Sequence, residues 1–227
     1  MSEYKSMVDL KIKTIILKVV LIGETSVGKS SIINRFVENQ FYKNFSPTMS
    51  GTCVTKEIFY EQYNKILKYE IWDTAGQEKY RSLTKMFYKD ASIVILVFDI
   101  TRKDTFEEIR DFWVKQVKEN SNEDIIISLV GNKEDNYEYE DIDNNNIELF
   151  VNQINCLYKR VSAKSGFGIE NLFYDLGLKY LDPEKYNSIL SKSVEYKKGN
   201  ISLSDFSKGN ITQQSIGEDK KKCCFQN

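Results

Sequence analysis

The chain contains no histidine, and this absence restricts the chemistry open to it. A Ser-His-Asp triad and a histidine-ligated metal site both need an imidazole, so neither can form. Cysteine is also scarce, since Cys53, Cys156, Cys223 and Cys224 are the four in 227 residues, and they show no metal-ligand spacing. This pattern favours a reducing, cytosolic compartment.

Long apolar runs and a strong charge imbalance are absent as well. No run of eighteen apolar residues occurs, so the sequence predicts no membrane-spanning helix. Residues 1–13 carry mixed charges, unlike a signal peptide, and Ser2 excludes N-myristoylation. The 32 basic and 33 acidic residues leave a net charge of −1, so we expect no nucleic acid as a partner. The length predicts one globular domain with tails.

What the sequence does contain is a phosphate-binding pattern. Residues 23–30, GETSVGKS, fit G-x-x-x-x-G-K-[ST]. A β-branched run over residues 14–22 precedes them and predicts a buried strand, and residues 31–37 follow with apolar side chains at helical spacing. A position between a strand and a helix distinguishes a phosphate-binding loop from a chance glycine turn before an ordinary helix.

Each residue type in this pattern has a chemical reason. Gly23 and Gly28 allow the backbone to turn tightly and to bring its N–H groups against phosphate oxygens. Lys29 reaches the β- and γ-phosphates, Ser30 offers a hydroxyl to Mg²⁺, and the helix that begins near Lys29 adds the positive end of its dipole. The predicted phosphate contacts are Gly23, Thr25, Ser26, Val27, Gly28, Lys29, Ser30 and Ser31.

Strands and helices alternate along the chain. Apolar runs predict strands over residues 14–22, 52–60, 65–72, 91–98, 125–130 and 157–161. Helical spacing predicts helices over residues 31–37, 83–89, 104–119, 142–154 and 169–181. This alternation predicts an α/β fold of the P-loop NTPase type, with a mostly parallel six-stranded sheet and helices on both faces. Pro183 stops the last helix, and the polar sequence beyond it predicts a disordered tail.

Three more candidate motifs follow predicted strands, where ligands of such sheets bind. Asp73 ends one strand and can hold Mg²⁺ through water, and Gly76 can offer its N–H to a γ-phosphate. In residues 132–135, NKED, Asp135 can accept hydrogen bonds from guanine N1 and N2, positions at which adenine is mismatched. Residues 162–164, SAK, can close over the base. Each motif alone is common as a solvated turn, but four in order at strand ends indicate a guanine-nucleotide site.

With these motifs the chain resembles a small GTPase of the Ras superfamily, and within it the Rab branch. The resemblance covers residues 14–181 and rests on the four motifs together with Trp72 and residues 79–83, KYRSL. Similarity to early-endosomal Rabs rests on Ser31 and on residues 35–37, 40–41, 82–83 and 86–88. The resemblance implies a small G-protein fold and a GTP/GDP-cycling switch that uses Mg²⁺ and hydrolyses GTP slowly.

The resemblance also assigns roles to individual residues. Thr48 matches the threonine that ligates Mg²⁺ and senses the γ-phosphate, Phe41 the aromatic that packs against guanine, and Gln77 the catalytic glutamine that orients the attacking water. It implies nucleotide contacts from Phe41, Thr48, Gly76, Asn132, Lys133, Asp135, Ser162, Ala163 and Lys164, and metal contacts from Ser30, Thr48 and Asp73. Arg35 and Arg81 are interpreted as surface residues first, so no arginine finger is evident in cis and hydrolysis depends on an activating partner.

Some positions depart from the Rab pattern. Cys53 stands where Rabs usually have Phe, and Phe87 stands where they usually have Tyr, while Trp72 matches. Ser50 also replaces a usual Gly. These departures fall on the aromatic triad that effectors read and on its surroundings, and they leave the nucleotide motifs intact.

The last residues predict a lipid anchor. A lysine run over residues 220–222 precedes the adjacent Cys223 and Cys224. Two lipid chains anchor a protein stably and lysines attract anionic lipid, so the resemblance implies double geranylgeranylation of this cysteine pair. Two alternatives stay open, namely single farnesylation through the C-a-a-X-like residues 224–227 and unmodified cysteines in a flexible tail.

These features predict an N-terminal extension over residues 1–13, a GTPase domain over 14–182 and a hypervariable tail over 183–227. The resemblance implies an exchange factor, a GTPase-activating protein, effectors, a prenylation escort and a GDP-dissociation inhibitor as partners, with no stable oligomer. It implies a location on the cytoplasmic face of intracellular, preferably endosomal, membranes, with cycling through the cytosol. The alternatives are a non-trafficking Ras-like GTPase, a hydrolysis-poor GTP-binding scaffold, which Gln77 disfavours, and a P-loop kinase or ATPase, which Asp135 disfavours.

Overall fold

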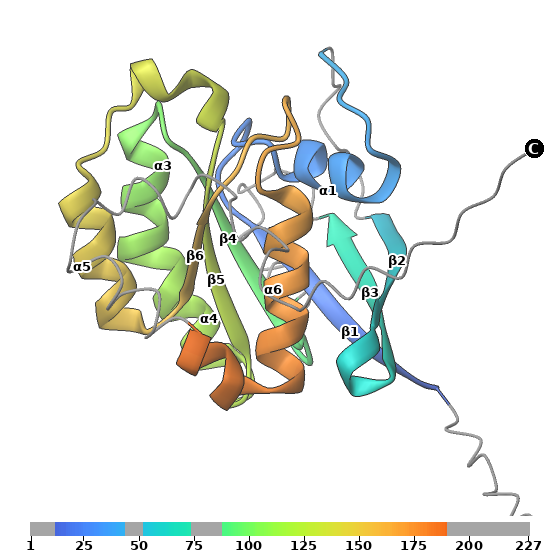
Figure 1. Ribbon diagram of the computed structural model, residues 1–227. Helices are drawn as coiled ribbons and strands as arrows, with labels where there is room; N and C mark the ends of the chain where they lie inside the picture. The colour runs from blue at the N-terminus through green and yellow to red at the C-terminus, as the bar shows by residue number, and fades with distance from the viewer. Residues whose placement is uncertain (1–11, 44–51, 74–87, 190–227) are drawn as a thin grey trace, which may run out of the picture.

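The computed structural model describes residues 12–43, 52–73 and 88–189, and these residues form one sheet with helices on both of its faces (Figure 1). The six strands lie in the order β2-β3-β1-β4-β5-β6. Their bounds are β1 Lys13–Ile22, β2 Thr52–Tyr60, β3 Lys65–Asp73, β4 Ile93–Asp99, β5 Ile126–Asn132 and β6 Leu157–Arg160. Every pairing is parallel except that of β2 with β3, so the predicted α/β fold with a mostly parallel sheet is confirmed.

The helices fall into two groups, one on each face of the sheet (Figure 1). One face carries α1 (Lys29–Glu38) and α6 (Ile169–Leu181), and the other carries α3 (Lys103–Glu108), α4 (Val114–Asn120) and α5 (Asn144–Ile154). Each group closes a separate apolar core against the sheet. No helix among residues 12–43, 52–73 and 88–189 is both long and apolar enough to cross a membrane.

Strand β4 lies at the centre and feeds both cores. All seven of its residues are buried, and successive side chains alternate between the core under α1 and α6 and the core under α3 to α5. Burial on both faces explains why its sequence, IVILVFD, is continuously apolar until Asp99. Each such aliphatic side chain contributes about 1.5–3 kcal/mol through removal of its surface from water.

The segment predicted as one helix over residues 104–119 contains a π-helical turn. Ile109–Trp113 forms this turn between α3 and α4. The backbone dihedrals at both junctions stay in the αR region, so the helix continues without a break. A π turn inserts one extra residue into the helix, so the side chains that follow it are rotated relative to a regular pattern. Ile109, Trp113 and Val117 all face the core, while Phe112 packs at its margin.

Helical structure continues past residue 183, the predicted start of the tail. Pro183 ends α6 as expected, but residues 183–189 form a further helix. Asp182 Oδ1 accepts a hydrogen bond of 2.9 Å from the backbone N–H of Lys185, and proline suits the first position of such a helix because its missing N–H is not needed there. Tyr186 is 4% exposed and joins the core beside α6. The predicted helix over residues 83–89 lies almost entirely outside the described residues.

Candidate nucleotide-binding site

The predicted motifs meet at one edge of the sheet, where the parallel strands end. In the strand register Leu21 of β1 lies beside Asp73 of β3, and Asp99 of β4 lies beside Asn132 of β5. Strands β1, β3, β4, β5 and β6 run parallel and all end at this edge (Figure 1). This is the place where open α/β sheets bind ligands.

The loop over residues 23–28, here called the glycine loop, joins β1 to α1 under tight steric limits. Gly23 has a φ of 152°, and a Cβ on it would lie 2.1 Å from the carbonyl oxygen of Val97 in β4. Gly28 has a φ of 97°, and a Cβ on it would lie 2.3 Å from Asn132 Nδ2. Both positions therefore exclude a side chain, because the loop lies directly against two neighbouring strands.

Lys29 begins α1 and turns its side chain back over the glycine loop. It is 6% exposed, and its Nζ donates to the carbonyl oxygens of Gly23, at 2.5 Å, and Glu24, at 2.9 Å. Thr25 and Ser26 are exposed on the outer side of the loop, and Val27 is buried beneath it. The loop thus combines an ammonium group with the positive end of a helix, an arrangement that suits an anion.

Asn132 connects three loops of the site. Its side chain is buried, its Nδ2 donates to the carbonyl oxygen of Val27 at 2.8 Å, and its Oδ1 accepts from the backbone N–H of Ala163 at 3.1 Å. The residue was predicted as a nucleotide contact, and its observed hydrogen bonds hold the glycine loop, the 132–135 turn and residues 162–164 in one arrangement.

Asp135 is held by the segment that follows β6. Its Oδ1 accepts a hydrogen bond of 2.6 Å from Ser162 Oγ, and its Oδ2 lies 3.0 Å from Lys164 Nζ. Burial by itself raises the pKa of Asp135, but the hydrogen bonds from Ser162 and Lys164 outweigh it and hold that pKa below its usual range. The carboxylate is therefore ionised and oriented, as an acceptor for two donors must be.

Lys133 has a partner that the sequence did not indicate. The residue adopts a left-handed backbone with a φ of 69°, and its Nζ lies 2.5 Å from Asp99 Oδ2 at the end of β4. Asp99 is 1% exposed, and its Oδ1 accepts hydrogen bonds from the backbone N–H and the hydroxyl of Thr101. An acidic residue at the end of an otherwise apolar strand was the signal that could have identified Asp99.

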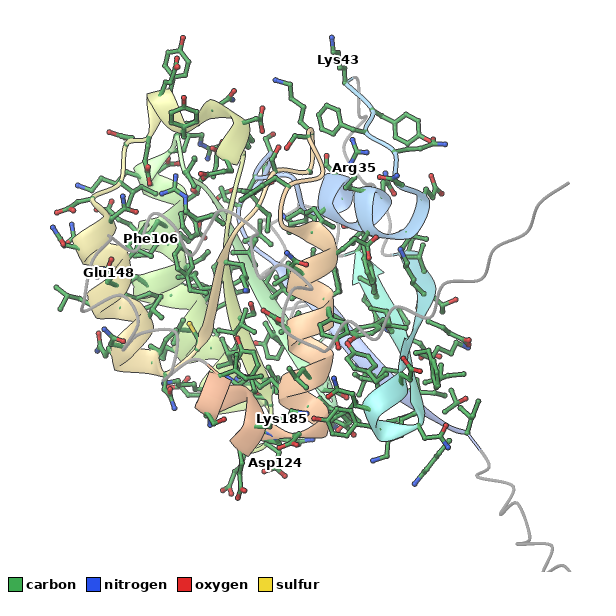
Figure 2. All side chains as sticks on the ribbon, in the orientation of Figure 1. Arg35, Lys43, Phe106, Asp124, Glu148 and Lys185 are labelled. Carbon is green, nitrogen blue, oxygen red and sulfur yellow. The ribbon has the colours of Figure 1, made fainter. Side chains whose placement is uncertain are left out.

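Arg35 is not a surface residue without a role. From α1 its Nε donates to the carbonyl oxygen of Ala163 at 2.9 Å, and a second guanidinium nitrogen donates to that of Lys164 at 2.8 Å (Figure 2). A further nitrogen donates to the carbonyl oxygen of Asn39 at 2.9 Å. Arg35 therefore fixes residues 163–164 to α1, which sequence reasoning missed because the contact spans more than half of the chain.

Arg102, which follows β4, approaches the glycine loop. One of its guanidinium nitrogens donates to the carbonyl oxygen of Thr25 at 3.2 Å, and another lies 3.0 Å from Asp104 Oδ2. The hydrogen bond that this guanidinium donates to the Asp104 carboxylate raises the pKa of Arg102 above its usual range. Sequence reasoning did not single out Arg102 either.

The remaining predicted residues are placed less completely. Asp73 is 6% exposed at the end of β3, Ser30 and Ser31 are half-buried in the first turn of α1, and Phe41 is half-buried against the core under α1 and α6. The Ser30 hydroxyl at the start of α1 and the Asp73 carboxylate at the end of β3 are hard oxygen donors of the kind that Mg²⁺ prefers, so these residue types fit that ion. The other predicted residues, Thr48, Gly76, Gln77, Cys223 and Cys224, lie outside the described residues.

The geometry defines the class first. A parallel sheet with a glycine loop, a loop-capping lysine and convergent polar turns at the strand ends is the architecture of a P-loop nucleotide-binding protein. A sequence model of the Ras family matches residues 18–182. The chain therefore belongs to the Ras family.

The similar proteins are Rab proteins. The chain is 39% identical to the Ras-related protein RabJ of Dictyostelium discoideum over 181 residues, which cover 80% of this chain and 66% of that relative. It is 33% identical to human Rab-22A over 208 residues, covering 92% of this chain and 97% of that relative. It is 38% identical to rat Rab-31 over 189 residues, covering 82% of this chain and 93% of that relative.

These similarities confirm the predicted class within the family. The chain is a Rab-like small GTPase of vesicle trafficking, and it is a GTP hydrolase as Ras-family small GTPases are. Guanine-nucleotide binding and a dependence on regulators and effectors in general follow with the class. A non-trafficking GTPase and a hydrolysis-poor scaffold are not favoured.

Proposed function

We propose that this chain is a switch of early endosomal membrane traffic, which binds effectors when it holds GTP and releases them after hydrolysis. The observation that carries the nucleotide-binding core of the proposal is the pair of hydrogen bonds by which Asn132 joins the glycine loop to the 162–164 segment. Phosphate and base are recognised by different loops, so a nucleotide needs both loops at a fixed separation. Buried amide hydrogen bonds supply that fixed separation.

Guanine recognition is assigned to Asp135. An ionised carboxylate accepts two hydrogen bonds from the N1 and N2 edge of guanine, and adenine cannot supply that pair of donors. Competition against labelled GTP on the full-length protein tests the assignment. Unlabelled GTP is expected to displace the label at micromolar concentration, whereas a thousandfold excess of ATP leaves it bound. Displacement by ATP at a concentration comparable to GTP would contradict guanine specificity.

Phosphate and metal contacts are assigned to the residues around the glycine loop. Lys29 binds the β- and γ-phosphates, and the Ser30 hydroxyl and the Asp73 carboxylate hold Mg²⁺, Asp73 through water. When bound, the ion neutralises charge on the β- and γ-phosphates. Ser30→Asn is expected to weaken GTP binding more than GDP binding. Unchanged preference for GTP over GDP in that variant would contradict the metal role of Ser30.

Switching and hydrolysis are assigned to residues known here only from the sequence. Thr48 and the Gly76 N–H respond to the γ-phosphate, and Gln77 orients the attacking water. Single-turnover hydrolysis by the full-length protein tests this role of Gln77. The rate is expected to fall at least tenfold in Gln77→Leu, with GTP binding retained. Equal rates would overturn the catalytic assignment.

Membrane attachment is assigned to the C-terminal cysteine pair. Prenylation of Cys223 and Cys224, supported by the preceding lysines, would hold the protein on the cytoplasmic face of endosomal membranes, and an escort and a GDP-dissociation inhibitor would handle the lipidated form. The endosomal part of this assignment rests on the resemblance of residues 35–37, 40–41, 82–83 and 86–88 to early-endosomal Rabs. Replacement of both cysteines by serine is expected to shift the protein from the membrane fraction to the cytosol. Persistent membrane fractionation would reject the anchor.

A further inference from the structure

Arg160, the last residue of β6, is the centre of a nearly buried ion network beside the Asp135 turn. Its Nε lies 2.5 Å from Glu134 Oε2, and its two terminal nitrogens lie 2.9 Å from the two carboxylate oxygens of Glu140. One of these nitrogens also donates to Asn144 Oδ1 at 3.1 Å. The side chain of Arg160 is 10% exposed, and those of Glu134 and Glu140 are 22% and 17% exposed.

The network acts on the residue next to Asp135. Glu134 lies between Lys133 and Asp135, and its backbone N–H donates to the carbonyl oxygen of Val161 at 3.0 Å. Ser162, two positions after Arg160, holds the Asp135 carboxylate itself. The end of β6 therefore holds two successive side chains of the 132–135 turn. Arg160 pairs with Glu134, and Ser162 donates to Asp135.

We propose that Arg160 is a positioning residue for guanine selectivity, because its paired ion bridges to Glu134 and Glu140 fix the turn that carries Asp135. The inference rests on the proposed function of Asp135 as the guanine-reading group. A bidentate guanidinium pair fixes both distance and angle, which a single hydrogen bond does not. Removal of Arg160 leaves two half-buried carboxylates close together, and their repulsion displaces the turn.

A residue that only stabilises the fold would affect stability and not guanine selectivity. A variant of the neighbouring Lys159 distinguishes these two roles. Lys159 Nζ lies 2.6 Å from Asp175 Oδ2 on α6, and the two side chains are 18% and 17% exposed. This pair sits on the same short strand, one residue earlier, and is comparably buried. It faces α6 and not the 132–135 turn, because alternate residues of a strand point to opposite faces. Lys159→Ala is therefore the matched control.

The test compares dissociation of GDP and of IDP from the full-length protein in the presence of magnesium. The hypoxanthine base of IDP keeps N1–H but lacks the exocyclic amino group of guanine. The ratio of the IDP rate to the GDP rate therefore reports on the hydrogen bond from that amino group, one of the two that Asp135 accepts. We expect Arg160→Ala to raise the GDP rate about tenfold, the usual size of losses when a residue that supports a binding group is removed, and to bring the ratio close to one. Lys159→Ala is expected to lower the melting temperature and to leave the ratio unchanged.

Further variants keep each outcome decisive. Glu134→Ala combined with Glu140→Ala breaks the network from the other side and is expected to reduce the ratio as Arg160→Ala does, which also serves if Arg160→Ala does not fold. Asp135→Ala tests the underlying assignment. If Asp135→Ala removes the selectivity and neither network variant changes the ratio, the inference about Arg160 is overturned while the proposed function stands. If Asp135→Ala leaves the ratio unchanged, the proposed reading of guanine fails.

Discussion

Asn132 Nδ2 lies 2.8 Å from the carbonyl oxygen of Val27, a residue 105 positions earlier in the chain. The hydrogen bond is buried, and the same amide accepts from Ala163 through its oxygen. Two loops that are distant in sequence are therefore joined by one side chain. Loss of that side chain leaves one buried acceptor and one buried donor without their observed partner.

Asn132→Ala is expected to destabilise the fold and to loosen nucleotide binding together. The free energy of unfolding should fall by about 2 kcal/mol, because buried polar groups lose their hydrogen bonds. GDP should also dissociate faster, since the two halves of its site are no longer joined. Urea unfolding in saturating GDP and GDP displacement measure the two effects. Asn120→Ala is the control, because it removes a hydrogen bond of the same length, 2.8 Å, from a side-chain amide to the carbonyl oxygen of Gln116 within α4, away from the site. It should leave the dissociation rate unchanged.

The pH dependence of stability should carry a contribution from Asp135. Its pKa is lowered in the folded protein although burial opposes the shift, because Ser162 and Lys164 donate to the carboxylate. A carboxylate whose pKa is lower in the folded state stabilises the protein at any pH above its ordinary pKa of about 4. This stabilisation is lost as the pH falls through the folded-state pKa. Melting temperatures of wild type and Asp135→Asn should therefore differ at pH 7 and converge in acid. A difference that grows toward low pH would show the opposite sign of linkage.

Arg35→Ala is expected to accelerate nucleotide release without a large loss of stability. The variant frees the carbonyl oxygens of Ala163 and Lys164 from α1, so the segment that closes over the base becomes looser. We expect GDP dissociation to rise by roughly threefold to tenfold, in line with the loss of one or two charge-assisted hydrogen bonds that are partly solvated. Arg110→Ala, which removes an exposed arginine paired with Asp111, should leave the rate as it is. Equal effects of both variants would argue against a local clamp.

Gly177→Ala should destabilise the protein although alanine is the better helix former. A Cβ at position 177 would lie 2.0 Å from Tyr60 Oη and 2.2 Å from Tyr69 Oη. An exposed glycine-to-alanine change inside a helix stabilises by about 1 kcal/mol, whereas overpacking of a core costs about 1–3 kcal/mol. The sign of the change in unfolding free energy decides between them. Asn171→Ala, at an exposed position of α6, is the control and should stabilise slightly.

Most of the fold could be predicted because its elements carry their own local patterns. The run IVILVFD is buried on both faces, which its composition indicates directly, and the glycines at positions 23 and 28 mark a turn that no other residue fits. The π turn at Ile109–Trp113 could not be predicted, because it depends on how the helix packs on the sheet. The helix over residues 183–189 was missed because its sequence is mostly polar and a single buried side chain, that of Tyr186, packs it against the core.

The same distinction between local patterns and long-range contacts applies to the residues of the candidate site. Motif residues such as Lys29, Asn132 and Asp135 could be found from spacing, since the chemistry needs those residue types at strand ends. Arg35 and Arg160 could not be found in this way, because their partners lie far away in sequence and no local motif marks either arginine. The roles of Thr48, Gln77 and the cysteine pair remain predictions.

The packing of Tyr60 and Tyr69 has a consequence for how the protein can change shape. Their hydroxyls lie 2.8 Å apart and share a hydrogen bond. Both also contact backbone carbonyl oxygens of α6, Tyr69 Oη lying 2.8 Å from that of Phe173 and Tyr60 Oη 2.9 Å from that of Tyr174. If the β2–β3 hairpin slid along the sheet, both hydroxyls would lose their contacts with these carbonyl oxygens at once. We therefore expect the β2–β3 hairpin to stay fixed against α6 through the whole nucleotide cycle. Rearrangement would then be confined to the connections that precede Thr52 and follow Asp73.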